Sequence, residues 1–179
     1  AELEKVQPVE SHERWAKEFL KQKYTQGATQ AGLDRMRERN SLYLDHYLNL
    51  DFEPRSLTAD DPNDFFDRTY GNPDVIGPRA DHGTSVAGII AANRQNEVGI
   101  KGIAEAVEIM AIRSTPDGDE RDKDVALGII YAVDNGADIV NMSFGKGYSP
   151  NQAFLDSAIL YAEKNGVLLV HTAGNEGKN

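Results

Sequence analysis

A histidine stands at the start of a predicted helix that is rich in small residues. Residues 81–88 read DHGTSVAG, and His82 is the second of them. Small residues allow a helix to lie close to whatever covers it, and they serve no purpose on an exposed helix. A lone histidine is more often structural or solvated, but the small residues around His82 make it a candidate functional residue.

A second polar group follows an apolar segment near the end of the chain. Residues 167–172 read VLLVHT and residues 173–177 read AGNEG. Asn and Gly both tolerate a positive φ, so one interpretation of AGNEG is a simple turn. The functional interpretation is that the Asn175 side-chain amide donates a hydrogen bond to an oxyanion formed during acyl transfer.

The apolar spacing predicts the elements that must position these groups. The predicted order is a helix beginning near residue 82, a strand at 107–113, a helix at 122–135, a strand at 138–143, a helix with Ser149 as N-cap and Pro150 as first residue, and a strand at 167–172. Alternating helices and strands with short links indicate a parallel sheet, and nearly continuous apolar strands indicate burial on both faces. Sites in such sheets form beyond the carboxyl ends of the strands, where residues 143–145 and 173–177 lie.

The first seventy residues have a different pattern. Amphipathic helices are predicted at residues 9–23 and 31–48. Residues 51–72 are acidic and rich in Pro, Asn and Asp, which predicts a loop with at most one short helix, at residues 64–68. We therefore predict a mostly helical segment at residues 1–70 and an α/β segment at residues 71–179.

Composition narrows the function classes. The chain has 179 residues, a net charge of −10 and no cysteine. An acidic chain is a poor match for nucleic acid, and disulfides are ruled out. No apolar run approaches the ~20 residues of a membrane-spanning helix. The first residues show no signal-peptide pattern, and both ends read as cuts inside a longer protein.

Three segments together resemble the subtilase family of serine proteases. They are HGTSVAGIIAA at residues 82–92, VNMSFG at residues 140–145 and VHTAGNEG at residues 170–177. Their order and spacing are similar to those of the family, over roughly residues 70–179. The resemblance implies an α/β fold, a partial subtilisin-like three-layer arrangement with a parallel sheet flanked by helices.

The resemblance also implies roles for individual residues. His82 would take the proton of a catalytic serine and later protonate the leaving amine, and Asn175 would bind the oxyanion. The implied substrate-binding residues are Ser143, Phe144 and Gly145 on one wall of the first specificity pocket, Thr172, Ala173 and Gly174 on the other wall, and Asp117, Gly118 and Asp119 in a loop that pairs with the substrate as an added β-strand. The implied partner is a peptide or protein substrate. The acidic residues of the loop suggest a preference for substrates with basic side chains at an outer subsite.

Two features of the family are missing from the sequence. The sequence has no apolar strand that ends in Asp-Ser-Gly or Asp-Thr-Gly. It also has no serine box, in which Gly-Thr-Ser is followed by Met or a small residue, then by Ala and a nearby Pro. Residues 83–87, GTSVA, mimic the serine box, but they follow His82 directly and lack the proline. We expect the chain to supply the histidine and asparagine of a Ser-His-Asp protease and to be inactive alone. Residues 1–70 would then be an insertion between the aspartate and histidine boxes, resembling insertions in subtilases of Bacteroidetes-like bacteria.

The resemblance carries three further expectations. Residues 93–98 align with a loop that holds structural calcium in many subtilases, although the chemistry itself requires no cofactor and no catalytic metal. An extracytoplasmic location is implied. Because flanking strands would be missing, exposed sheet edges are expected to make the chain self-associate or to leave it only marginally stable.

Three alternatives remain open at this point. The first is a non-enzymatic α/β pseudoprotease or binding module. It would differ from a protease in that the parent protein lacks an intact catalytic triad. A nucleotide-binding domain would need a glycine-rich loop after a strand, whereas residues 99–102, GIKG, precede one. A metallohydrolase would need a second histidine at helical spacing from His82.

Overall fold

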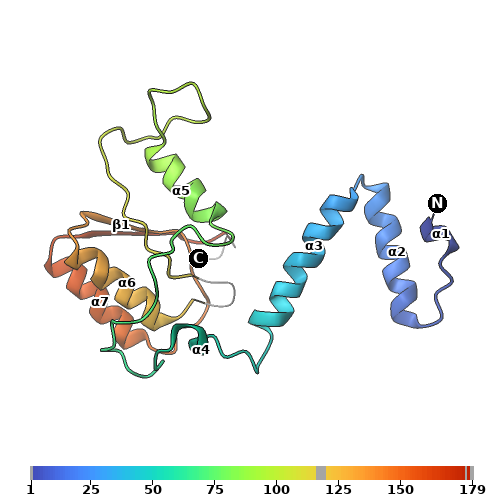
Figure 1. Cartoon of the computed structure of the whole chain (residues 1–179), viewed down its shortest axis with the longest axis horizontal. Coiled ribbons are helices and arrows are strands. Elements are labelled where there is room, and N and C mark those ends of the chain that lie inside the picture. Colours follow the sequence, from blue (N-terminus) through green and yellow to red (C-terminus); the bar gives the residue numbers. More distant parts are fainter. Residues whose placement is uncertain (1, 116–119, 176, 178–179) are drawn as a thin grey trace. The chain divides into compact units, whose positions relative to one another are not determined.

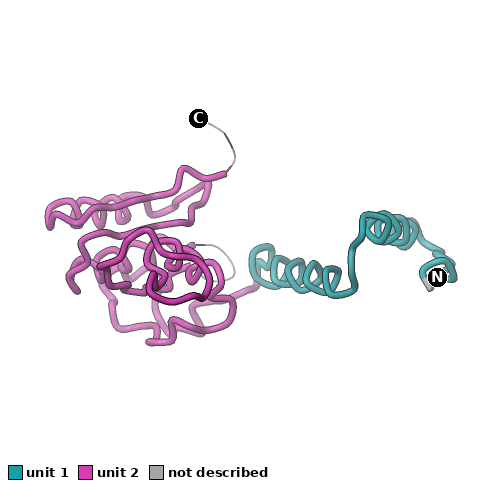
Figure 2. The backbone as a smooth tube through the Cα atoms, turned by 90° about the horizontal axis from the view of Figure 1, so that it is seen from above, with its two compact units in different colours: residues 1–50 teal, residues 51–179 magenta. Residues whose placement is uncertain are grey.

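The structure is a computed structural model that describes residues 2–115, 120–175 and 177. It divides into two compact units, residues 1–50 and residues 51–179 (Figure 2). This boundary lies earlier in the chain than the predicted junction after residue 70. The interpretation of residues 1–70 as an insertion concerns a parent protein and stays a prediction.

The first unit is helical. Its elements are α1 (Glu2–Lys5), α2 (Ser11–Thr25), α3 (Gln30–Leu42) and a π-helical turn (Tyr43–Tyr47). At the start of α2, the side chains of Glu10 and Glu13 and their backbone N–H groups form a reciprocal capping box. At the start of α3, the Thr29 hydroxyl accepts a hydrogen bond from the Gly32 N–H at 3.2 Å. Both predicted helices are confirmed, each within a few residues except that the second ends in the π-helical turn.

The second unit contains the predicted helices and a small parallel sheet. Its elements are α4 (Arg55–Thr58), α5 (Asp81–Ala91), α6 (Asp122–Asp134), β1 (Ile139–Met142), α7 (Gln152–Lys164) and β2 (Leu168–His171) (Figure 1). The two strands pair in parallel, with Ile139 opposite Leu168 and Met142 opposite His171. A parallel pair needs a crossover, and α7 supplies it. The predicted α/β class is thus confirmed, in the form of a partial fold with a small parallel sheet.

The core of this unit lies between the strands and the pair α6 and α7. The two helices lie side by side on one side of the strands (Figure 1). The buried apolar residues of this core are Val125, Ala126, Ile129, Ile130, Met142, Ala158 and Ala162. Their three- and four-residue spacings on each helix follow the predicted amphipathic pattern. Ala158 and Ala162 are fully buried, and their small side chains allow α7 to pack closely.

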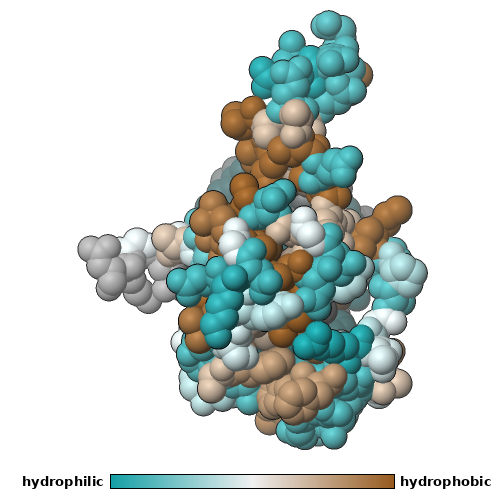
Figure 3. Space-filling view, turned by 90° about the vertical axis from the view of Figure 1, so that its left-hand side faces the viewer, coloured by the Kyte–Doolittle hydropathy of each residue, from teal (hydrophilic) through white to brown (hydrophobic). Residues whose placement is uncertain are grey.

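The strands are less enclosed than the sequence predicts. Ile139 and Leu168 are 60% and 58% exposed, and Val170 also remains exposed. In Figure 1, α5 stands on the side of the strands away from α6 and α7. Figure 3 shows apolar residues, in brown, directly below a hydrophilic tip, with polar residues interspersed among them over the rest of that view. We call Ile139, Leu168 and Val170 the open sheet face.

Residues 107–113 do not form the predicted strand. They have no regular secondary structure, and Val107, Ile109 and Met110 are between 41% and 49% exposed. The only ladder in the described residues joins β1 to β2, so the backbone of this apolar run pairs with no described strand. An apolar pattern indicates burial, but a strand also requires a partner for its backbone groups.

Two shorter predictions in this unit are wrong. The short helix of the 51–72 loop is α4 rather than residues 64–68. There the Asp64 carboxylate accepts hydrogen bonds from the Phe66 and Asp67 N–H groups and forms a turn. Helix α7 begins at Gln152, not at Pro150, and its N-cap is Asn151 without a side-chain hydrogen bond. The backbone N–H of this N-cap, Asn151, donates to Asp122 Oδ2 at 2.7 Å.

Candidate functional site

Parallel pairing brings two of the predicted site segments to one edge of the sheet. Met142 and His171 are register partners at the carboxyl ends of β1 and β2. The Thr172 N–H continues the ladder by donating to the Met142 carbonyl oxygen at 3.1 Å. Residues 143–145 and residues 172–175 therefore leave the sheet side by side, at the edge where parallel sheets place their sites.

Contacts between these two segments run through the ring of His171. The Phe144 ring meets it edge-on, with centroids 6.3 Å apart. A Cβ placed on Gly145 would lie 3.5 Å from the same ring, in ordinary van der Waals contact, so Gly145 borders this ring directly. Ser143 is held from the strand side, because the Asn141 side-chain amide donates to its hydroxyl at 2.9 Å. His171 is therefore a packing residue between the two predicted pocket walls.

The turn that carries Asn175 depends on glycine. Gly174 has a φ of +78°, in the left-handed region, and its N–H donates to the Thr172 hydroxyl at 3.1 Å. Asn175 follows directly and is exposed, as are Thr172 and Ala173. A side-chain amide held at the end of a constrained turn is a suitable donor for an oxyanion.

His82 lies in the first turn of α5 and is exposed. Within the described residues, no hydrogen bond or ion pair joins its ring to the strand ends. A shared cleft for His82 and Asn175 therefore stays a prediction. The predicted substrate loop of Asp117, Gly118 and Asp119 lies outside the described residues.

The carboxyl end of α5 is closed by the segment that follows it. The bonds run from the Gly102 N–H to the Ala92 carbonyl (2.9 Å), from Ile103 to Ile89 (3.0 Å) and from Ala104 to Ile90 (2.8 Å). They satisfy carbonyl groups that a helix end otherwise leaves without partners. A Cβ on Gly102 would lie only 2.3 Å from the Ala92 nitrogen, so this approach requires glycine.

A cluster of charged residues ties the segment after β1 to the start of α6. We call Glu120, Asp122 and Lys146 the 120–146 clamp. The Lys146 ammonium lies 2.8 Å from Asp122 Oδ1 and donates to the Glu120 carbonyl oxygen at 2.6 Å. Glu120 Oε1 accepts the Gly145 N–H at 3.1 Å, and Asp122 Oδ2 accepts the Asn151 N–H at 2.7 Å.

The Asp122 side chain is 1% exposed. Burial alone raises the pKa of Asp122, but the bonds from Lys146 and Asn151 outweigh this effect and hold the pKa below its ordinary value.

A second charged network joins residues 55–70 to the same helix. We call Arg55, Asp60, Tyr70, Lys123 and Asp124 the 55–124 network. Its contacts are Lys123 to Asp60 (2.8 Å), Arg55 to Asp124 (2.9 Å), Arg55 to Asp60 (3.2 Å) and the Tyr70 hydroxyl to Asp124 (2.6 Å). The Lys123 ammonium also lies 4.4 Å from the centre of the Tyr70 ring. Burial and the Asp124 carboxylate raise the pKa of Tyr70.

Nothing in the sequence analysis indicates the clamp or the network. Asp122 and Lys123 begin the predicted helix at residues 122–135, and charged residues in a first helical turn are ordinarily solvated. Each pairs with a residue far away in the sequence, so no local pattern indicates the contact. The one available signal is a lysine immediately after residues 143–145, the predicted pocket wall.

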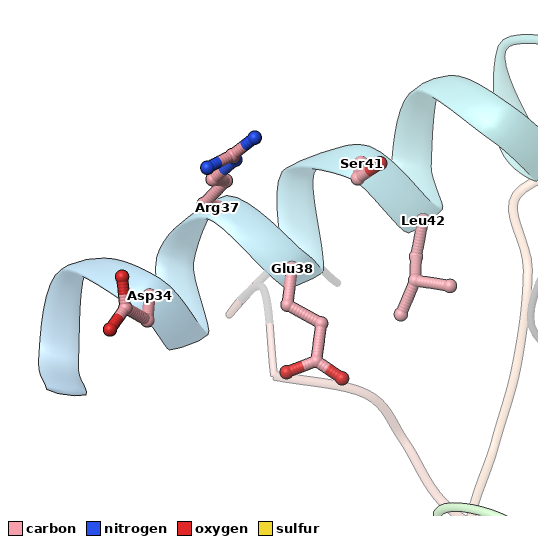
Figure 4. Close-up of a pocket in the computed structure, with 5 residues that line it drawn as sticks. All are labelled: Asp34, Arg37, Glu38, Ser41 and Leu42. Atoms are coloured by element: carbon pink, nitrogen blue, oxygen red, sulfur yellow. The ribbon is translucent and has the colours of Figure 1, made fainter.

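Other parts of the described structure add no site. The hollow drawn in Figure 4 is lined by Asp34, Arg37, Glu38, Ser41 and Leu42, all from α3. Within the described residues, no three His, Asp or Glu side chains are grouped to hold a metal ion. In residues 93–98, Asn93 and Asn96 turn their carboxamide oxygens to backbone N–H groups two residues on. Calcium binding by this loop stays a prediction. No described helix is long and apolar enough to cross a membrane.

Comparison with known proteins gives consistent matches. The model of the Subtilase family matches residues 9–179. The thermophilic serine proteinase of Bacillus sp. (strain AK1) is 38% identical over 117 residues, which is 65% of this chain and 28% of that protein. The major intracellular serine protease of Bacillus subtilis is 39% identical over 115 residues, 63% of this chain and 35% of that protein. The minor extracellular protease Vpr of the same species is 31% identical over 134 residues, 74% of this chain and 14% of that protein. No solved structure matches the chain. The chain thus spans at most about a third of the length of these relatives.

Proposed function

Because the chain belongs to the subtilase family, we propose that it forms part of a serine endopeptidase that cleaves peptide bonds through a Ser-His-Asp triad. In this proposal His82 is the general base and Asn175 binds the oxyanion. Residues 143–145 and 172–174 form the walls of the first specificity pocket. The serine and the aspartate come from outside this chain, which is therefore inactive alone.

The observation that supports the proposal is the common edge of β1 and β2. Residue 143 follows one strand and residue 172 follows its register neighbour, so the two predicted pocket walls are adjacent without any adjustment of the backbone. The Gly174 turn then presents Asn175 beyond that edge. The substrates are proposed to be peptides or proteins, bound in extended form along the same edge.

A proposal for the location of the protein comes from the names of its relatives. One relative is named an extracellular protease and another an intracellular one. We propose an extracytoplasmic location, which a fractionation of the native cells with an antibody against the chain would test.

The test of the proposed activity uses the chain itself and a chimaera. In the chimaera, residues 81–175 replace the matching segment of the thermophilic Bacillus relative, which supplies the remaining catalytic residues. The chain alone is expected not to hydrolyse an activated ester or a peptide anilide. The chimaera is expected to hydrolyse both, and His82→Ala is expected to lower its kcat by roughly 10⁴-fold or more, as loss of a triad member does in serine proteases.

Matched controls separate loss of chemistry from loss of folding. Glu163→Ala and Lys164→Ala change exposed residues within the same segment and should leave kcat within about twofold. Circular dichroism confirms that each variant is folded. A folded chimaera without hydrolysis contradicts the protease proposal and favours a binding module, and turnover by the chain alone that His82→Ala abolishes contradicts the proposed inactivity.

A further inference from the structure

The 120–146 clamp has no role in the chemistry proposed above, yet it holds charged groups out of solvent beside a pocket wall. The Asp122 and Lys146 side chains are 1% and 15% exposed. An enclosed ion pair contributes little net stability, because desolvation of both charges offsets their attraction. A pair of this kind is therefore better explained by the geometry that it fixes.

The clamp fixes the backbone immediately after the pocket wall. Residues 143–145 lie between β1 and Lys146, outside the ladder. The Glu120 carboxylate holds the Gly145 N–H, and the Lys146 ammonium is held in turn by Asp122 and by the Glu120 carbonyl oxygen. Asp122 also holds the Asn151 N–H at the start of α7. The segment between β1 and α7 is thus anchored at three points within seven residues of chain.

We propose that Asp122 and Lys146, together with Glu120, are positioning residues that hold residues 143–145 in the conformation that binds an extended peptide. This inference rests on the proposed function, since it assigns residues 143–145 to a substrate pocket. It makes the peptide KM depend on side chains that do not contact the substrate.

The first experiment needs no activity. Amide hydrogen exchange is measured by NMR at Gly145 and Asn151 in the whole chain. Lys146→Met is expected to accelerate exchange at both amides by about tenfold, the effect of losing about one hydrogen bond. Lys146→Arg, which keeps the charge, should remain within about threefold of wild type. Lys164→Met, an exposed lysine of α7, is the matched control and should change neither amide.

The second experiment uses the chimaera described above. Lys146→Met is expected to raise the KM for a tetrapeptide anilide by about fivefold or more, with kcat changed by less than about twofold. Hydrolysis of p-nitrophenyl acetate, which is too short to occupy the pocket walls, should be unchanged. If Lys146→Met does not fold, Glu120→Ala tests the Gly145 amide and the KM in the same way, with Glu163→Ala as its control.

Each outcome decides the proposal. Unchanged exchange at Gly145 in a folded Lys146→Met or Glu120→Ala protein overturns it. Faster exchange with an unchanged peptide KM also overturns it, because the clamp would then be structural only. Absence of hydrolysis in the folded wild-type chimaera overturns the proposed function and, with it, the positioning role, whereas hydrolysis that is insensitive to the clamp overturns the positioning role alone.

Discussion

At the scale of single residues, Asp60 shows how a carboxylate is kept charged in a nearly dry environment. Its side chain has no exposed surface. Burial by itself raises the pKa of Asp60, but the Lys123 and Thr58 hydrogen bonds and the charges of Arg55 and Lys123 outweigh it, so the net pKa lies below the ordinary value of 3.8. The ionised form is therefore favoured more strongly in the folded protein than in the unfolded chain.

This shift predicts the acid sensitivity of the fold. A lowered folded-state pKa means that Asp60 contributes stability above its unfolded pKa and loses the contribution as the pH falls through the folded-state pKa. The urea midpoint should therefore fall between pH 6 and pH 3. Asp60→Asn is expected to lower the midpoint at pH 6 and to make its pH dependence shallower, since the variant has lost one group that titrates.

The matched control is Asp156→Asn, which changes an exposed carboxylate on α7. It should keep the slope of the wild-type chain. An Asp60→Asn protein with the full wild-type slope would show that this carboxylate does not govern the acid transition.

At the scale of elements, the closure of α5 by residues 102–104 predicts an intolerant glycine. Gly102→Ala is expected to lower the free energy of unfolding by about 1–3 kcal/mol, because the added Cβ would overlap the Ala91 and Ala92 backbone. Gly147→Ala is the control, since a Cβ there meets open space. Urea denaturation followed by circular dichroism compares the two variants; equal stability would contradict the close approach.

The helices and the two strands could be predicted from the sequence because their signals are local. The apolar spacing of α6 and α7 and the short apolar runs of β1 and β2 each reside within one segment. The run at residues 107–113 gave the same signal, but strand formation depends on a neighbour that the run cannot specify. Ser149 and Pro150 carry a helix-start pattern, yet α7 begins at Gln152. The N–H of its N-cap, Asn151, donates to Asp122, a tertiary contact that no local pattern indicates.

The candidate site divides in the same way. Residues 143–145 and 173–175 could be placed at one sheet edge from strand order alone. The clamp could not, because the partners of Lys146 and Asp122 are brought together only when α6 packs on the strands. The ring of His171 between the pocket walls likewise depends on the register of β1 against β2.

At the scale of the whole molecule, the open sheet face predicts association between copies of the chain. Ile139, Leu168 and Val170 are exposed together on a two-stranded sheet whose outer edges have no ladder partner in the described residues. Apolar strands with free edges are sites of intermolecular pairing. Light scattering after size exclusion is expected to give a mass that rises with protein concentration.

Leu168→Lys should reduce this association, because a charge on the open sheet face opposes apolar contact. Leu57→Lys is the control, since Leu57 is exposed on α4 and lies outside the sheet. A monomer at every concentration in the wild-type chain would contradict the expectation.

The 55–124 network also carries an evolutionary consequence. Its two cations, Arg55 and Lys123, balance two anions, Asp60 and Asp124, so the group is electrically neutral. A single substitution at any of these positions would strand a charge in a poorly hydrated environment. Related sequences should therefore exchange these residues in complementary pairs. Covariation between positions 60 and 123 would indicate that residues 51–70 pack on α6 in those proteins as well.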